Sequence, residues 1–211
     1  DGPPFAEERW VFGAPACASA YRAELIRDCG GFDAAMEAYL EDVDLSLRAQ
    51  AFGFPCLYVP SARVVHRGSA TYGWGSGSGR AERLHARNRL RLFARSMPRS
   101  ALRAGAPALA VSVAADLAFR VARGDHPVPV LRGTIEGVQG LKAAAAGRPA
   151  ALGARRVDDA WIGDILRDSE ARLLELADGP SSGSRRARVA LARALMAWVD
   201  RRERAQARPR W

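Results

Sequence analysis

The spacing of hydrophobic and polar positions changes character near residue 80. Before that point, short apolar runs alternate with helical patterns, which is typical of mixed α/β structure. One helix is expected at 22–29, where Gly30-Gly31 would end it, and another at 41–52, where Val43, Leu47 and Ala51 share one face. Strands are expected at 11–21, 56–59 and 63–66.

From Arg80 onward the pattern is helical. An apolar stripe runs along one face of the first helix, formed by Ala86, Leu90, Phe93 and Met97. Arginines line another face of the same helix: Arg83, Arg87, Arg91 and Arg95. Further helices are expected at 100–122, 130–146, 158–177 and 185–204. A loop rich in Gly and Ser, at 68–79, separates this region from the mixed part.

Composition excludes several classes of protein. The chain has 211 residues, a net charge of +9 and 48% hydrophobic residues, which fits a globular protein and not a disordered or collagen-like one. Its three cysteines have no paired spacing, so neither a disulfide scaffold nor a structural zinc site is expected. Residues 1–50 carry a net charge of −6 and the remainder +15, which suggests different partners for the two parts.

No segment looks like a membrane span or a signal peptide. The longest apolar window with almost no charge, 104–115, has twelve residues, and a spanning helix needs about 18 or more. The first residues lack a basic region followed by an apolar run. Because the chain opens on Asp1, it is expected to be a piece of a longer polypeptide.

Five short motifs follow one another between Gly13 and Ser69. They are Gly30-Gly31-Phe32-Asp33, the run Tyr39 to Arg48 that reads YLEDVDLSLR, Gly53-Phe54, Tyr58-Val59-Pro60, and Ala62 to His66. In this order they closely resemble the C-terminal half of the catalytic domain of family-2 glycosyltransferases, especially rhamnosyltransferase-like and galactofuranosyltransferase-like members. Arg87-Asn88 extends the likeness to about residue 96.

The resemblance implies a fold and an activity. It implies that residues 1–98 form the C-terminal half of a GT-A, Rossmann-like α/β domain, and that residues 99–211 form a basic, mainly helical region. The implied reaction is inverting, metal-dependent transfer of a sugar from a nucleotide-sugar donor, UDP- or dTDP-linked, to a glycan acceptor that can be lipid-linked. The family's nucleotide-binding half and its DxD motif have no counterpart in the sequence.

By this resemblance, Asp42 is the catalytic base and Glu41 or Asp44 orients neighbouring groups. One base suffices chemically, because a nucleoside diphosphate leaves without help from a general acid. Asp42 would begin a helix, where the dipole favours an ionised carboxylate. Read without the flanking motifs, the same acids would simply cap the helix, and Asp44 would pair with Arg48 one turn later.

His66 is the predicted metal ligand, by resemblance, at the end of the strand 63–66. Because imidazole binds Mn²⁺ more readily than Mg²⁺, the expected metal is Mn²⁺, with Mg²⁺ as the second choice. The alternative role for His66 is that of a structural, hydrogen-bonded residue. Gly31 and Asp33 would border the acceptor pocket, and Trp74 could stack on an acceptor sugar. The glycine-rich loop that holds Trp74 could equally be an ordinary solvent loop.

The four arginines of the first long helix and the apolar run 101–119 could lie along anionic lipid headgroups. Similar transferases often carry such tails at the cytoplasmic face, so the resemblance implies a cytoplasmic protein, peripheral at the inner face of the plasma membrane. A soluble helical bundle is the alternative arrangement of this region. Nucleic-acid binding is not expected, since no helix-turn-helix, RRM or zinc signature is present. The rival function is a non-catalytic, membrane-associated or assembly module, and the chain by itself is expected to bind no nucleotide sugar measurably.

Overall fold

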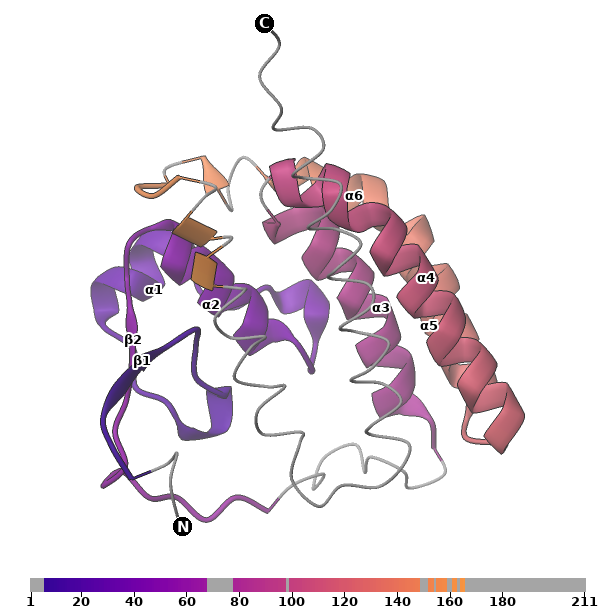
Figure 1. Cartoon of the computed structure of the whole chain (residues 1–211), viewed down its shortest axis with the longest axis horizontal. Coiled ribbons are helices and arrows are strands. Elements are labelled where there is room, and N and C mark those ends of the chain that lie inside the picture. The colour runs from indigo at the N-terminus through magenta and orange to yellow at the C-terminus, as the bar shows by residue number, and fades with distance from the viewer. Residues whose placement is uncertain are drawn as a thin grey trace, which may run out of the picture. The chain divides into compact units, whose positions relative to one another are not determined.

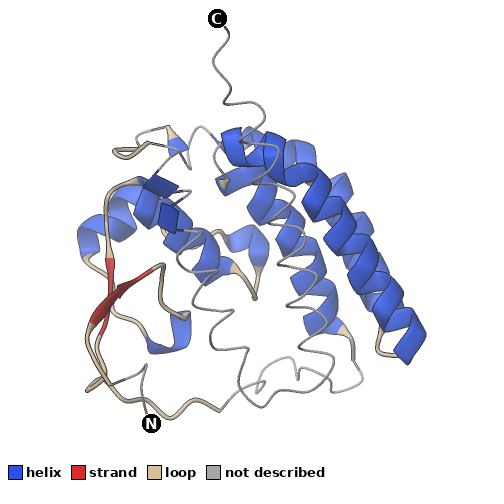
Figure 2. Cartoon of the chain, viewed as in Figure 1, coloured by secondary structure: helices blue, strands red, loops and turns tan. Residues whose placement is uncertain are grey.

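The computed structural model describes residues 6–67, 78–97 and 99–148, together with 152–153, 155–158, 161–162 and 164–165. Of these residues, 63% are helical and 4% lie in strands (Figure 2). The expected Rossmann-like α/β fold is therefore wrong for the described part of the chain. The helices predicted at 158–177 and 185–204 fall almost entirely outside the described residues.

The elements in chain order are shown in Figure 1. The strands are β1 (Arg9–Val11) and β2 (Cys56–Tyr58), and the short 3-10 helices are η1 (Ala16–Ala18) and η2 (Ala34–Met36). The α-helices are α1 (Ala23–Cys29), α2 (Glu41–Ala51), α3 (Arg80–Ser96), α4 (Arg99–Arg123), α5 (Pro127–Gln139) and α6 (Leu141–Ala146). The chain divides into two compact units, Asp1–Met97 with Leu117–Asp158, and Pro98–Asp116 with Asp159–Trp211.

The sheet explains why the α/β prediction failed. β1 pairs only with β2, antiparallel, with Trp10 opposite Leu57. Of the strand expected at 11–21, only Val11 lies in β1, and Ala16–Ala18 forms η1 instead. The strand expected at 63–66 has no regular structure, and Val65 is fully exposed. β-Branched residues favour a strand only where a neighbouring strand offers partners, and the described residues provide none here.

The helices of the first half agree with the hydrophobic pattern. α1 ends at Gly30 as predicted, because Gly30 adopts a left-handed φ of 75° and Gly31 donates its N–H to the carbonyl of Ile26. α2 also begins and ends within a residue of the prediction. Its residues from 44 to 51 are all buried, and with Met36 and Leu25 they form the core of this unit.

α3 packs side by side with α5 and α6 (Figure 1). The region predicted as one helix at 130–146 is interrupted at Gly140, which ends α5 and precedes α6. The close approach of α5 to α3 requires glycine at position 133. A Cβ built there would lie 2.0 Å from the backbone oxygen of Arg83. At Gly137 the nearest atom would be the end of a flexible side chain, Leu90 Cδ1, at 2.8 Å.

This geometry predicts that Gly133→Ala destabilises the unit, by about 1–3 kcal/mol, because α5 must move away from the backbone of α3. Helix propensity alone would give the opposite sign, a gain of about 1 kcal/mol. Chemical denaturation should therefore show a lower midpoint for Gly133→Ala. The matched variant is Gly137→Ala, whose loss should be smaller because the side chain of Leu90 can turn aside. Equal effects of the two substitutions would contradict this account.

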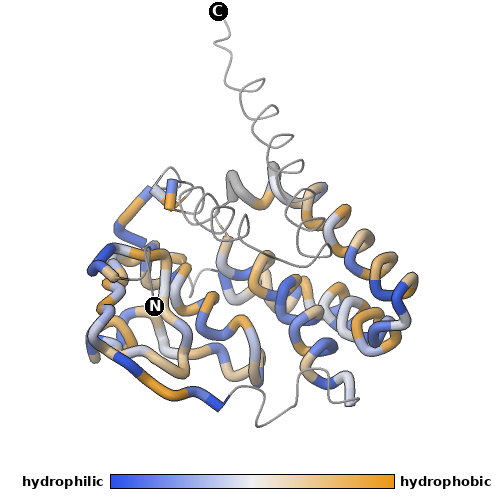
Figure 3. Tube along the Cα trace, turned by 60° about the horizontal axis from the view of Figure 1, so that its bottom comes forward, coloured by the Kyte–Doolittle hydropathy of each residue, from blue (hydrophilic) through white to orange (hydrophobic). Residues whose placement is uncertain are grey.

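α4 contains a long apolar segment. Its segment Gly105–Arg123 has 19 residues, and by length and composition alone it could cross a membrane. None of the residues in its apolar window is fully buried by the described part of the chain, and many are half-buried. The uncharged window 104–115, on which a membrane span was rejected, is only part of the helix. The helix is longer because it continues through Pro107 and past Asp116. Elsewhere, hydrophobic and hydrophilic residues alternate along the helices (Figure 3).

Candidate functional site

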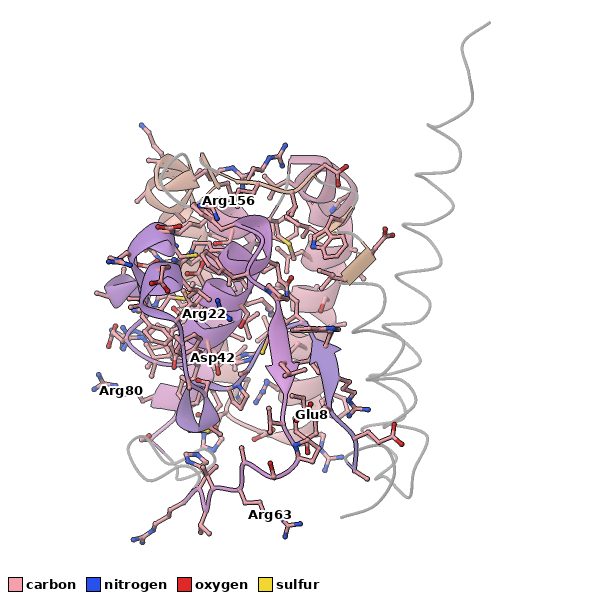
Figure 4. The ribbon with its side chains drawn as sticks, turned by 90° about the vertical axis from the view of Figure 1, so that its left-hand side faces the viewer. Glu8, Arg22, Asp42, Arg63, Arg80 and Arg156 are labelled. Carbon is pink, nitrogen blue, oxygen red and sulfur yellow. The ribbon has the colours of Figure 1, made fainter. Side chains whose placement is uncertain are left out.

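Glu41 and Asp42 open helix α2, as the sequence predicts. The carboxylate of Asp42 accepts hydrogen bonds from the N–H of Ala16 at 3.2 Å and of Val43 at 2.8 Å. The first bond ties η1 to the start of α2 across 26 residues of sequence. Asp42 is half-buried, and Figure 4 shows it on the flank of the molecule that carries α1 and α2. No ion pair reaches it from the described residues.

Glu41 lies in a less hydrated position than its neighbour. Burial raises the pKa of the Glu41 carboxyl; the hydrogen bond from its own backbone N–H opposes this, and the charge of Asp42 adds to it. One of its oxygens, Oε2, is buried with no hydrogen-bond partner among the described residues. The same holds for Ser19 Oγ and Tyr21 OH, in the segment that follows η1. Such buried, unsatisfied groups are uncommon in proteins and are typical of places that bind water or a ligand.

The turn that leads into α2 has an unusual backbone. Glu37, Tyr39 and Leu40 all have positive φ, between 62° and 69°. Such values are rare for residues other than glycine and cost about 1–3 kcal/mol each. The turn is held from α3: the side-chain amide of Asn88 donates to the carbonyls of Met36, Ala38 and Tyr39, each at 2.8 Å. The surroundings therefore fix the conformation in which Glu41 and Asp42 are presented.

Asp44, the third acid of the motif, is a structural residue. It pairs with Arg48 at 2.6 Å, one turn away as predicted, and both side chains are fully buried. Arg48 also donates to the carbonyls of Cys29 and Gly31, and Asp44 accepts from Arg95 at 3.1 Å. This buried charge cluster joins the end of α1, α2 and the end of α3. It leaves no part of Asp44 free to orient a substrate.

The predicted acceptor-binding residues are engaged within the protein or lie outside the described residues. Asp33 caps η2 by accepting from Ala35 N–H, and it pairs with Arg91 at 2.7 Å. Gly31, with φ of 67°, uses its carbonyl to accept from Arg48. Both positions therefore support the fold directly, and a sugar would have to displace Arg91 to reach Asp33. Trp74 and most of its loop lie outside the described residues.

His66 does not end a strand. It lies in an exposed stretch without regular structure, and Arg63 marks this stretch at the lower edge of Figure 4, apart from Asp42. Within the described residues, no group of three or more His, Cys, Asp or Glu side chains could hold a metal ion. A Mn²⁺ or Mg²⁺ site needs several oxygen or imidazole ligands at one point, and the described residues bring no such group to His66; residues 68–77, which follow it, lie outside the described part of the chain.

The arginine stripe of α3 does not face outward as a set of free cations. Each member forms an ion pair with a carboxylate of the protein, at 2.7–3.1 Å: Arg83 with Glu136, Arg87 with Glu37, Arg91 with Asp33 and Arg95 with Asp44. Contact of these arginines with lipid headgroups stays a prediction, and each of the four guanidinium groups already has a carboxylate partner. Their role in the structure is to join α3 to α5, η2 and α2.

These ion pairs predict how stability depends on pH. Burial tends to raise the pKa of Asp33, but the hydrogen bond from Arg91 helps to outweigh burial and the pKa is lowered. The same balance lowers the pKa of Glu136, whose main partner is Arg83. The hydrogen bond from Arg87 lowers the pKa of Glu37. A carboxyl whose pKa is lowered by folding stabilises the folded state at any pH above its ordinary pKa, here 3.8 or 4.5. This contribution is lost as the pH falls below that pKa and through the lowered one.

We therefore expect the midpoint of thermal unfolding to fall as the pH is lowered from about 5 to about 3, because the carboxylates of Asp33, Glu37 and Glu136 take up protons. Scanning calorimetry at several pH values would measure it. Glu136→Gln removes one of these carboxyls and should flatten the fall. An unchanged midpoint for the parent chain over this range would show that the ion pairs of α3 contribute nothing to stability.

Two participants in this site carried no signal in the sequence. Glu37 sits between residues that suggest no function, and its partners Arg80 and Arg87 are more than 40 residues away. Asn88 belongs to the Arg87-Asn88 motif, but its contacts to the turn before α2 could not be expected from spacing.

No family model matches the chain, and neither a curated protein nor a solved structure shows significant similarity to it.

Proposed function

We propose that Asp42, with Glu41 beside it, is the base of a glycosyltransferase that uses a nucleotide-sugar donor, UDP- or dTDP-linked, and a glycan acceptor. The observation that supports this most is the selective neutralisation of acids around α2. Asp33, Glu37 and Asp44 each pair with at least one arginine, whereas Glu41 and Asp42 pair with none of the described residues. Two adjacent acids left uncompensated, one with a raised pKa, are typical of a functional site.

The proposed step follows from this placement. An acceptor hydroxyl attacks the anomeric carbon, and the new glycosidic C–O bond forms as the bond to the diphosphate oxygen breaks with inversion. The hydroxyl proton passes to the carboxylate of Asp42. The nucleoside diphosphate leaves as an anion and requires no proton. Two backbone N–H groups, of Ala16 and Val43, hold the carboxylate of Asp42 in place at the start of α2.

The proposal requires less than the resemblance implied. It does not use a Rossmann-like sheet, and no step in it passes through a metal ion, because the described residues do not form a metal site around His66. The uncompensated acids carry the proposal. The resemblance in the motifs from Gly30 to His66 supplies the class of reaction.

A second candidate is a membrane-associated module without catalysis, at the cytoplasmic face. It is favoured by one observation, the apolar helix Gly105–Arg123, none of whose residues is fully buried in the described part of the chain. The two candidates are compatible if the acceptor is lipid-linked, since the same helix would hold the protein at the membrane that contains the acceptor. Flotation of the protein with phosphatidylcholine vesicles, with and without phosphatidylglycerol, tests the association without reference to catalysis.

Release of nucleoside diphosphate tests the glycosyltransferase directly. The natural protein that contains these residues would be incubated with UDP- and dTDP-sugars, one at a time, and with lipid-extracted glycans as acceptors. A donor-specific, acceptor-dependent release is expected. If no donor is consumed while vesicles still float the protein, the transferase proposal fails and the membrane module is favoured.

A further inference from the structure

The turn before α2 must be held against its own backbone preference. Three of its residues, Glu37, Tyr39 and Leu40, have positive φ without being glycine. At about 1–3 kcal/mol each, these conformations persist only where the surrounding structure imposes them. Strain of this kind is common beside functional sites, and here it directly precedes Glu41.

Asn88 supplies most of that restraint. Its side chain is completely buried, and the two protons of its Nδ2 group are shared among three acceptors of the turn, the carbonyls of Met36, Ala38 and Tyr39. Its Oδ1 accepts from Arg87 Nε at 3.0 Å, which fixes which way the amide faces. Arg87 adds its own bonds to the carbonyls of Ala35 and Met36.

The restraint reaches the acids through Leu40. This residue is the left-handed N-cap of α2, and its carbonyl accepts the first bond of the helix, from Asp44 N–H at 2.9 Å. A turn that relaxed to ordinary φ values would redirect the first turn of α2, which carries both carboxyls. It would also expose Glu41, whose burial depends on this geometry.

We propose that Asn88 is a positioning residue: by binding the carbonyls of Met36, Ala38 and Tyr39, it fixes the strained turn that places the Glu41 and Asp42 carboxyls. It touches no reacting atom. The proposal rests on the proposed function of these acids, but its geometric part can be tested without any turnover.

The test compares Asn88→Leu with the parent chain. Leucine has the same number of side-chain heavy atoms and the same branching, and it can neither donate nor accept, so it removes the hydrogen bonds at the cost of some extra volume. Asn88→Ser is the second variant, should the leucine protein fail to fold. Ser96→Ala is the matched control, because it removes another buried hydrogen bond of α3, to Asp44, at a distance from the turn.

Two readouts are independent of activity. Hydrogen exchange of the peptide covering 36–42 should be at least tenfold faster in the Asn88 variants and unchanged in Ser96→Ala. A ¹³C titration of the Glu41 carboxyl, assigned with Glu41→Gln, should show its pKa falling toward the ordinary value of 4.5 in the Asn88 variants only. A general loss of stability would raise exchange throughout the unit instead.

A third readout separates this proposal from the proposed function. In an active protein, the pH at which transfer reaches half its maximum should move in the Asn88 variants and stay in place in Ser96→Ala. If exchange and titration change as expected but no variant or parent shows transfer, the transferase proposal fails and the positioning of the acids stands. Unchanged exchange at 36–42 and an unchanged Glu41 pKa in both Asn88 variants would overturn the role of Asn88.

Discussion

Replacing Asp42 with asparagine is expected to slow glycosyl transfer by about 10²- to 10⁴-fold, the usual contribution of a positioned general base. Asparagine keeps the size of the side chain and one oxygen to accept from Ala16 or Val43, so the local fold should survive. It has no capacity to take the acceptor's proton. The experiment uses the natural protein that contains these residues; its donor binding, measured by calorimetry, should be nearly unchanged while the turnover rate falls.

Two companion variants sharpen this result. Glu24→Gln removes an exposed acid of α1 and should leave the rate as it is. Glu41→Gln removes the neighbouring charge and should shift the pH at which the rate rises, because the two carboxyls interact. Asp42→Asn turnover close to that of the parent would remove Asp42 from the mechanism and leave Glu41 as the candidate base.

Arg48→Met is expected to produce the largest loss of stability, about 3–5 kcal/mol, because it breaks a buried ion pair and leaves the other charge behind. Arg48 and Asp44 are both fully buried. Without the guanidinium group, Asp44 retains Arg95 and Ser96, but the carbonyls of Cys29 and Gly31 lose their donor. Urea denaturation followed by circular dichroism would measure the free energy of unfolding.

The matched control is Arg27→Gln, which breaks the exposed pair with Glu24 on α1. Surface pairs of this kind contribute about 0–1 kcal/mol, so the midpoint should hardly move. Comparable losses for the two variants would mean that the buried cluster has no special role in joining α1, α2 and α3. Mutations at Arg48 are therefore unsuited to testing catalysis, since they unfold the support of the site.

The charge asymmetry of the chain takes on a different meaning in the structure. The acidic first fifty residues and the basic remainder suggested separate partners. Much of this complementarity is instead satisfied within one unit, where arginines of α3 pair with Asp33, Glu37 and Asp44. Glu41 and Asp42 differ from these acids, because neither forms an ion pair with any of the described residues.

The sequence by itself determined the features that depend on neighbours along the chain. The end of α1 at Gly30, the bounds of α2, the start of α3 at Arg80 and the pairing of Asp44 with Arg48 follow from helical spacing and from the φ available to glycine. The position of Glu41 and Asp42 at a helix start was predictable for the same reason. These interactions span one turn of helix or less, so the local pattern contains the information.

Only the tertiary structure decided the rest. Residues 63–66 are rich in β-branched side chains, but a strand needs hydrogen bonds from a second strand, and none of the described segments provides them. The arginine stripe looks solvent-facing until carboxylates about 50 residues away meet it. The positive φ of Tyr39 and Leu40 opposes their own preference and persists because Asn88, equally distant in sequence, holds the turn. Contacts across such separations form only when the helices pack, and no local spacing encodes them.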